Sequence, residues 1–232
     1  LSGAGEVLAN VSHRAMGLYD VVYQTPRLGQ YSLAVGAADV GGLSAEYSDT
    51  RSLGGEPARA RVAPVIAFEW SADDTITATG KDYISARWTG YVQPAFSEPY
   101  TFYCKVNDGA RLWVDGVLLF DGFEHDMGED GGFVELEGAT PGALVANLLV
   151  DIKLEFRENA GAAAVQLLWA SRSQPYSIVP ASRLFHMSTP VVASPFAVSP
   201  TASKATPPQN VELAIADWDS LLVTWDAPAS DG

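Results

Sequence analysis

Apolar and polar residues alternate in short runs along most of this chain. The clearest run is YTFYCKVNDGARLWVDGVLLFD, residues 100–121, in which the alternation is interrupted at Asn107-Asp108-Gly109 and at Asp115-Gly116. A period of two places apolar side chains on one face of a strand, and Gly-containing turns join neighbouring antiparallel strands. The segment therefore predicts consecutive β-hairpins, with Asp115-Gly116 as a two-residue turn.

Similar runs recur between residues 66 and 169, and each is bounded by Gly, Asp, Asn or Pro. That spacing predicts an antiparallel β-sandwich or barrel, and no window of helical periodicity competes with it. We expect the tryptophans that end such runs to lie in the core, and Trp113, which faces away from Leu112 and Val114, to be partly exposed. The apolar positions of these runs are Ile66, Phe68, Trp70, Ile84, Ala86, Trp88, Ile152, Leu154, Phe156, Val165, Leu167 and Trp169.

The first 40 residues contain two further alternating runs, separated by a Pro- and Gly-containing turn at residues 26–29. Their apolar positions are Tyr19, Val21 and Tyr23, then Tyr31, Leu33 and Val35. Together they predict one hairpin, which is too small to bury its own apolar face. The pattern resembles the last two strands of a filamin-type immunoglobulin-like repeat, so residues 1–40 are interpreted as the end of such a domain.

The middle of the chain carries short motifs in a distinctive order. They are GGLSAEY, IAFEW, YISARWTGYVQP, YTFYCKVNDGARLWVDGVLLFD and IKLEFRENAGAAAVQLLW. Their sequence and order resemble those of the PA14 domain family, whose members are β-sandwiches. The resemblance covers residues 41–187 and implies an all-β fold: an antiparallel β-sandwich with partial immunoglobulin-like β-sandwich modules on each side.

The composition changes after residue 187. Residues 188–205 are rich in Ser, Thr, Ala and Pro, which predicts an extended linker. Residues 206–232 contain two alternating runs, the second of which ends at Trp225. This segment resembles the start of a fibronectin type III domain, in which Trp225 would lie in the core. We therefore expect the chain to be a window on a longer multidomain protein.

The chain carries 14 basic and 28 acidic residues, a net charge of −14. This balance argues against nucleic acid and anionic lipid as partners, because both require clustered Lys and Arg. No apolar run is long enough to span a membrane, so no membrane insertion is expected in this segment. The single cysteine, Cys104, lies on the apolar side of its run and is predicted to be a small buried core residue.

The sequence shows no catalytic constellation. His13, His125 and His186 lie in three separate stretches, with no Ser or Cys motif to pair with them. Nucleotide-binding loops and clustered zinc ligands are missing as well. We therefore expect a segment that is not an enzyme.

The PA14 resemblance singles out Asn107-Asp108. In sugar-binding members of that family two successive aspartates, joined by a cis peptide, hold a calcium ion that chelates glycan hydroxyls. Here Asn107 stands at the first position and offers an uncharged carbonyl oxygen, and Asn159 matches the family's second calcium-site loop. The resemblance implies a calcium and glycan site at Asn107, Asp108 and Asn159. The alternative, which the residue types favour, is a plain turn at Asn107-Asp108-Gly109 and a plain connection around Asn159.

Two further features bear on binding. The stretch DGFEHDMGED, residues 121–130, holds five carboxylates. We interpret it as a solvated loop, with a weak calcium site or a surface for a basic partner as the sharper alternative. Asn10 begins an Asn-Val-Ser triplet, which is an N-glycosylation acceptor.

These observations predict a non-catalytic segment of a large modular protein that is secreted and extracellular or on the cell surface. Its work would be spacing, assembly or adhesion, and its partners neighbouring domains or copies of the same assembly. The alternative is a calcium-dependent carbohydrate-binding module of the lectin or adhesin kind. A second alternative is an accessory domain of a secreted glycosidase or protease, since the PA14 family also occurs attached to such enzymes.

Overall fold

The computed structural model divides the chain into two compact units. The larger is Gly36–Thr189, and the smaller combines Leu1–Val35 with Pro190–Gly232. The structure describes residues 2–3, 9–15, 18–23, 30–33, 36–125, 132–190, 196–198, 209–217 and 220–226. Among these residues, no helix is long and apolar enough to cross a membrane.

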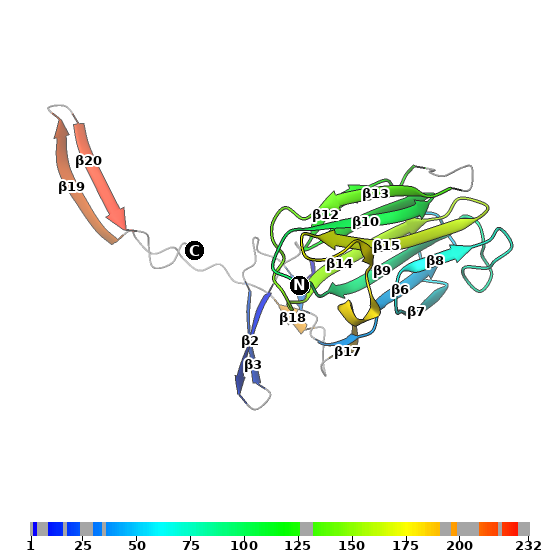
Figure 1. The fold of residues 1–232 in the computed structure, drawn as a ribbon. Coiled ribbons are helices and arrows are strands. Elements are labelled where there is room, and N and C mark those ends of the chain that lie inside the picture. The colour runs from blue at the N-terminus through cyan, green and yellow to red at the C-terminus, as the bar shows by residue number, and fades with distance from the viewer. Residues whose placement is uncertain are drawn as a thin grey trace. The chain divides into compact units, whose positions relative to one another are not determined.

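The larger unit is built from antiparallel strands, which confirms the predicted all-β fold (Figure 1). The alternating runs become strands because each buries one face. The elements are β5 (Gly36–Val40), β6 (Leu43–Ser48), β7 (Arg59–Ala63), β8 (Ala67–Trp70), β9 (Ser85–Val92), β10 (Tyr100–Asn107), β11 (Gly109–Val114), β12 (Val117–Asp121), β13 (Val134–Ala139), β14 (Val150–Arg157), β15 (Ala163–Ser171), β16 (Ser177–Ile178), the short 3-10 helix η1 (Ala181–Arg183) and β17 (Leu184–Pro190).

Two sheets stack face to face in this unit (Figure 1). The eight-stranded sheet has the order β12-β11-β14-β9-β17-β5, and β6 pairs with β9 and β7 beside this path. The five-stranded sheet has the order β13-β10-β15-β16, and β8 pairs with β15. Side chains from both inner faces form one core, which includes Trp88, Phe102, Phe156 and Trp169.

The predicted hairpin at Asn107-Asp108-Gly109 is wrong. Strand β10 ends at Asn107 in the five-stranded sheet, and β11 begins at Gly109 in the other sheet. Both edges of β10 are already occupied, by β13 and β15, so β11 has no edge to pair with. Asp108 is therefore the corner at which the chain crosses between sheets, with a left-handed φ of 72°. Gly109 is required there, because a Cβ would lie 2.2 Å from the Phe123 carbonyl oxygen.

The second predicted turn is confirmed. β11 and β12 pair antiparallel around Asp115 and Gly116, whose φ values are 54° and 70°. Positive φ at both central residues is the geometry that tight hairpins favour. Sequence alone identified this turn because both strands lie next to each other along the chain and in the same sheet.

Most of the predicted core residues are buried. Trp88 and Trp169 are fully buried, whereas Trp70 is half-buried and stacks on Phe68 with ring centroids 5.1 Å apart. Cys104 is fully buried, and burial raises the pKa of its thiol to about 12. The thiol is therefore a neutral core group at physiological pH, as predicted.

The smaller unit contains strands that the sequence predicted, in pairings that it did not. β1 (Ser2–Gly3), β4 (Tyr31–Leu33) and β18 (Phe196–Val198) form one sheet, and β2 (Ala9–Ala15) pairs with β3 (Leu18–Tyr23). The predicted hairpin between residues 19–23 and 31–35 is therefore wrong. Its first run, β3, pairs with the strand before it, and its second, β4, pairs with β1 and with β18, which follows the larger unit in sequence. Val35 and residues 24–29 lie outside the described residues.

The described residues between 191 and 232 also lie in strands. β18 lies within the segment predicted to be a linker and pairs with β4. β19 (Gln209–Asp217) and β20 (Ser220–Asp226) pair antiparallel, in agreement with the two alternating runs seen in the sequence. Their membership of a fibronectin type III domain, like the filamin-type assignment of residues 1–40, stays a prediction.

Candidate functional site

The corner at Asp108 and the loop after β14 lie side by side at one end of the sandwich. In the β11–β14 pairing Gly109 faces Arg157, so the residues just beyond them, Asp108 and Glu158, are brought together. The backbone N–H of Asn159 donates a hydrogen bond of 2.9 Å to Oδ2 of Asp108, across 51 residues of sequence. Two of the three predicted site residues are thus in direct contact.

Asn107 lies on the other side of the corner and is mostly buried. Its side-chain amide donates to the backbone carbonyl of Gly132 at 3.3 Å. This bond ties the end of β10 to the segment that precedes β13. Asn107 therefore shares the corner with Asp108, and its hydrogen bond to Gly132 is on the five-stranded side of the sandwich.

Glu158 is a further member of this site that sequence reasoning missed. Its side chain is fully buried, and neither carboxyl oxygen has a hydrogen-bond donor among the described residues. Burial raises the pKa of Glu158 to about 9, and the neighbouring Asp108 and Asp82 carboxylates add to the increase. A buried carboxyl without donors is costly unless a proton or a cation neutralises it.

The loop around Glu158 is held in place from the backbone. The N–H of Glu158 donates to the Ile84 carbonyl at 2.9 Å, and the N–H of Tyr83 donates to the Asn159 carbonyl at 3.0 Å. Asp82 accepts a 3.0 Å hydrogen bond from the N–H of Gly161. These bonds fix the loop, so the unpaired side-chain oxygens near Asp108 are held in position rather than exposed to water.

The corner contains carboxylate and amide oxygens, the donor atoms that a hard cation such as calcium would need. Among the described residues, Oδ1 of Asn159 is buried without a hydrogen-bond partner, like both oxygens of Glu158. The Asp108 carboxylate lies close to Glu158 and accepts from the backbone N–H of Asn159. Calcium prefers carboxylate and amide oxygens of this kind. Within the part of the chain that the structure describes, no three His, Cys, Asp or Glu side chains form a metal-holding group. The amide oxygens would therefore have to complete the ligand set.

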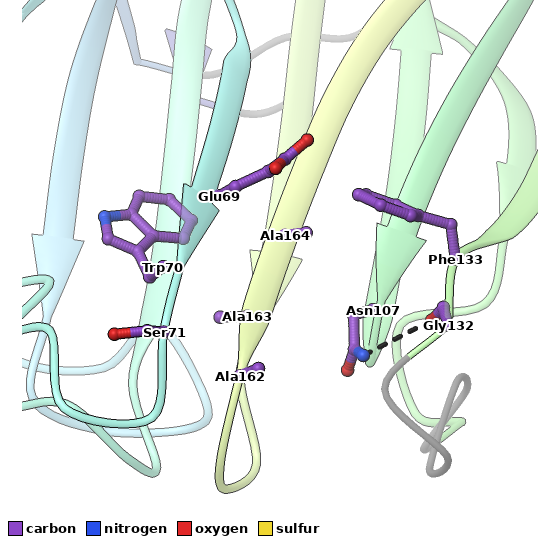
Figure 2. Close-up of a pocket in the computed structure, with 9 residues that line it drawn as sticks. All are labelled: Glu69, Trp70, Ser71, Asn107, Gly132, Phe133, Ala162, Ala163 and Ala164. Atoms are coloured by element: carbon purple, nitrogen blue, oxygen red, sulfur yellow. Dashed lines mark hydrogen bonds between the residues drawn. The ribbon is translucent and has the colours of Figure 1, made fainter.

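A hollow of about 280 Å³ opens beside Asn107 (Figure 2). Trp70 and Phe133 lie on either side of three alanines, one just before β15 and two at its start, which leave the space between the larger side chains open. Phe133 is 47% exposed. The residues that line the hollow are Glu69, Trp70, Ser71, Asn107, Gly132, Phe133, Ala162, Ala163 and Ala164.

Other candidates from the sequence do not join this site. Trp113 is partly exposed on the outer face of the eight-stranded sheet, as predicted, with Nζ of Lys153 3.9 Å from its ring centroid. In the acidic stretch, Glu124 pairs with Arg157 at 3.3 Å, and residues 126–130 lie outside the described part. Asn10 lies in β2, and the placement of its side chain is likewise not described.

The family model of the PA14 domain matches residues 39–183. The chain belongs to the PA14 domain family. This confirms the resemblance for the central segment, and the PA14 domain here corresponds to the two-sheet sandwich that carries the corner and the hollow. The match does not extend to the flanking segments, for which the filamin-type and fibronectin-type assignments are not shown.

The similar proteins include anti-sigma factors. The anti-sigma-I factor RsgI3 of Acetivibrio thermocellus is 40% identical over 132 residues, which cover 56% of this chain and 19% of that protein. A solved anti-sigma factor domain-containing protein is 37% identical with a TM-score of 0.58, covering 65% of this chain and 50% of that one. Another, from Clostridium clariflavum, is 26% identical with a TM-score of 0.54, covering 74% and 57%.

These relatives correct one expectation. The predicted location, a secreted protein that is extracellular or on the cell surface, is wrong, because the relatives are anti-sigma factors rather than secreted spacer proteins. Tandem β-sandwich patterning carries no information about compartment. The chain spans about a fifth of the curated relative and about half of each solved structure, so the activity of a whole protein is a matter for proposal.

Proposed function

We propose that the PA14 domain of this chain is the ligand-recognition part of a regulatory protein of the anti-sigma kind, and that its ligand is a carbohydrate bound with calcium. The observation that carries the proposal is the set of buried oxygens of Glu158 and Asn159 that have no hydrogen-bond partner within the described part of the chain, in the loop that contacts Asp108. It is a proposal for a binding domain, not for an enzyme.

The residues at the corner supply two kinds of oxygen ligand. Asp108 supplies negative charge, Glu158 would add to it once calcium displaces the proton that its raised pKa retains, and Asn107 and Asn159 supply amide oxygens. When bound, calcium would offer the remaining coordination positions to neighbouring hydroxyls of a sugar. The rigid loop after β14 keeps the Glu158 and Asn159 oxygens in place, which lowers the ordering cost of binding.

The hollow next to Asn107 supplies surface for the rest of a sugar ring. The exposed Phe133 offers aromatic surface on one side, the half-buried Trp70, which packs on Phe68, lines the other, and Glu69 and Ser71 offer polar groups at the rim (Figure 2). Sugars present apolar ring faces and hydroxyl edges, so a pocket with a few polar groups beside aromatic side chains suits them.

The regulatory context is supported by likeness to anti-sigma factors at 40% and 37% identity. A domain that recognises a ligand gives such a protein an input signal. Spacing or assembly, the function preferred from sequence, needs no buried oxygen cluster and no hollow, so those features favour recognition. Spacing or assembly remains the expected function if no ligand binds.

The test is calorimetric titration of the 232-residue chain with calcium, for the parent and for Asp108→Asn. Asparagine tolerates the left-handed φ of 72° at this corner, so the variant keeps the fold while it removes the charge. We expect heat of calcium binding in the parent and a loss of about tenfold or more in the affinity of the variant.

Asp39→Asn is the matched control, because Asp39 is exposed in β5 and outside the corner. It should bind calcium like the parent. If the parent shows no binding at about 1 mM calcium, or if Asp108→Asn binds equally well, the proposed site is refuted.

A further inference from the structure

The outer face of the five-stranded sheet carries an ordered surface that begins at the hollow. In β10 the side chains of Phe102, Cys104 and Val106 enter the core, so Tyr103 and Lys105 face outward. Strand register then aligns outward residues in rows across the sheet. One row is Glu69, Ala164 and Asn107; the next is Ala67, Gln166, Lys105 and Glu135; the third is Ile178, Leu168, Tyr103 and Glu137.

Two tyrosines mark the far end of this surface. Tyr176 is 45% exposed and packs edge-on against Tyr103, with ring centroids 5.0 Å apart. Its hydroxyl donates to the Glu135 carboxylate, and Nζ of Lys105 lies 5.6 Å from its ring centroid. An exposed aromatic ring that neighbouring polar groups hold in one orientation is a preorganised stacking surface.

The surface is continuous with the hollow. Glu69, Ala164 and Asn107 line the hollow and also form the first row of the outer face. Gln166 of the second row donates a 3.0 Å hydrogen bond to Glu69 of the first. Asn107 and Tyr103 are four residues apart on one strand, which separates the hollow from the tyrosine pair by about 13 Å. That length exceeds a single sugar ring.

The charge of this face limits the kind of chain it accepts. Glu69, Glu135 and Glu137 are exposed carboxylates, and Lys105 is the basic residue in these three rows. Nζ of Lys105 is already 4.0 Å from the Glu135 carboxylate. A polymer with its own carboxylates or sulfates would meet like charge here, whereas an uncharged chain would not.

We propose that the ligand is an uncharged polysaccharide that runs from the hollow across the outer face of the five-stranded sheet, with Tyr176 and Tyr103 as a distal stacking subsite. This inference rests on the proposed carbohydrate function and adds a second point of contact to it. It predicts that affinity grows with the length of the sugar chain until the tyrosine pair is reached.

Affinity electrophoresis in native gels tests the inference, with calcium and with xyloglucan, glucomannan, mixed-linkage β-glucan or polygalacturonate in the gel. Oligosaccharides of increasing length, cut from the polymer that retards the parent most, are then titrated calorimetrically. We expect Tyr176→Ala to lower the affinity for the polymer about tenfold and to leave the affinity for the shortest oligosaccharide unchanged. Phe96→Ala, which removes a comparably exposed (41%) aromatic ring outside these rows, should behave like the parent.

Each outcome decides between the two proposals. Retardation by an uncharged polymer, with a length dependence that Tyr176→Ala abolishes, supports the distal subsite. Equal affinities of Tyr176→Ala and the parent overturn the subsite and leave the calcium-dependent site intact. Strongest retardation by polygalacturonate overturns the charge argument and with it the inference. If no gel retards the parent in calcium, the carbohydrate function itself fails.

Discussion

At the scale of single residues, the unusual feature of this protein is a buried carboxyl group to which no described residue donates a hydrogen bond. Glu158 lies close to Asp108. Asn107 precedes Asp108 and Asn159 follows Glu158, and the sequence already singled out both asparagines. A structural carboxylate inside a β-sandwich normally finds an arginine or several N–H groups. Glu158 lies near the carboxylates of Asp108 and Asp82 instead, so its protonation is linked to the free energy of unfolding.

Raising the pH should destabilise the calcium-free protein through Glu158. The folded protein holds a proton on this carboxyl up to a pKa of about 9, against 4.5 for the ordinary group. Between these values the folded state binds more protons than the unfolded state, so the free energy of unfolding falls as the pH rises. We expect the melting temperature in EDTA to decrease from pH 5 to pH 9, and Glu158→Gln to flatten that decrease. A slope that persists in Glu158→Gln would contradict this assignment.

The sequence identified three residues of this site but not the buried carboxyl of Glu158. Asn107, Asp108 and Asn159 were identified because they match positions in a family motif. Glu158 precedes Asn159 and has no motif of its own. Burial raises its pKa most, and strand register, which places it near Asp108, adds to the increase; nothing local in the sequence encodes the register between β11 and β14, which are distant along the chain.

At the scale of elements, strand register also builds an ion-pair ladder on the outer face of the eight-stranded sheet. Glu155 of β14 faces Arg111 of β11 on one side and Arg87 of β9 on the other. The guanidinium nitrogens lie 2.6 and 2.8 Å from its carboxylate oxygens. Burial opposes ionisation of Glu155, yet the two arginines hold its pKa below the ordinary value. Three strands are thus joined by one carboxylate.

Removing that carboxylate should weaken the sheet. Glu155→Gln leaves two half-exposed guanidinium groups without their common partner, and we expect a loss of about 2 kcal/mol in the free energy of unfolding, measured with urea at pH 7. Glu46→Gln is the matched control, because Glu46 is 49% exposed and lies 4.0 Å from Arg87. It should cost less than about 0.5 kcal/mol. Equal losses in the two variants would show that the ladder is not centred on Glu155.

Elements were predicted more reliably than their partners. The period-two pattern identified β10, β11 and β12, because alternation reports which residues face a core. It could not show that β10 and β11 belong to different sheets. That separation depends on β13 and β15, which occupy both edges of β10 and are distant in sequence. The Asp115-Gly116 turn was predicted correctly because hairpin geometry is local.

At the scale of the whole molecule, the PA14 domain is inserted in sequence between two parts of the smaller unit. β4 precedes the domain and β18 follows it, yet these strands pair with each other. Such a pairing has no local signal, since the partners are separated by an entire domain. This is the physical reason why the predicted hairpin of residues 1–40 was wrong although its strands exist.

The PA14 domain should fold without its flanks. The core cluster extends from Leu43 to Leu184, entirely inside the larger unit. Its first and last strands, β5 and β17, are neighbours in the eight-stranded sheet, so the unit closes on itself. We therefore expect residues 36–189 to unfold cooperatively, with a melting temperature within about 3 °C of the main transition of the full chain.

The same piece should keep the calcium affinity of the parent, because the corner at Asp108 and the loop at Glu158 lie within it. An excised domain that melts at much lower temperature would mean that part of its stability comes from residues 1–35 or 190–232. Loss of calcium binding at unchanged melting temperature would instead place a ligand in those flanking residues.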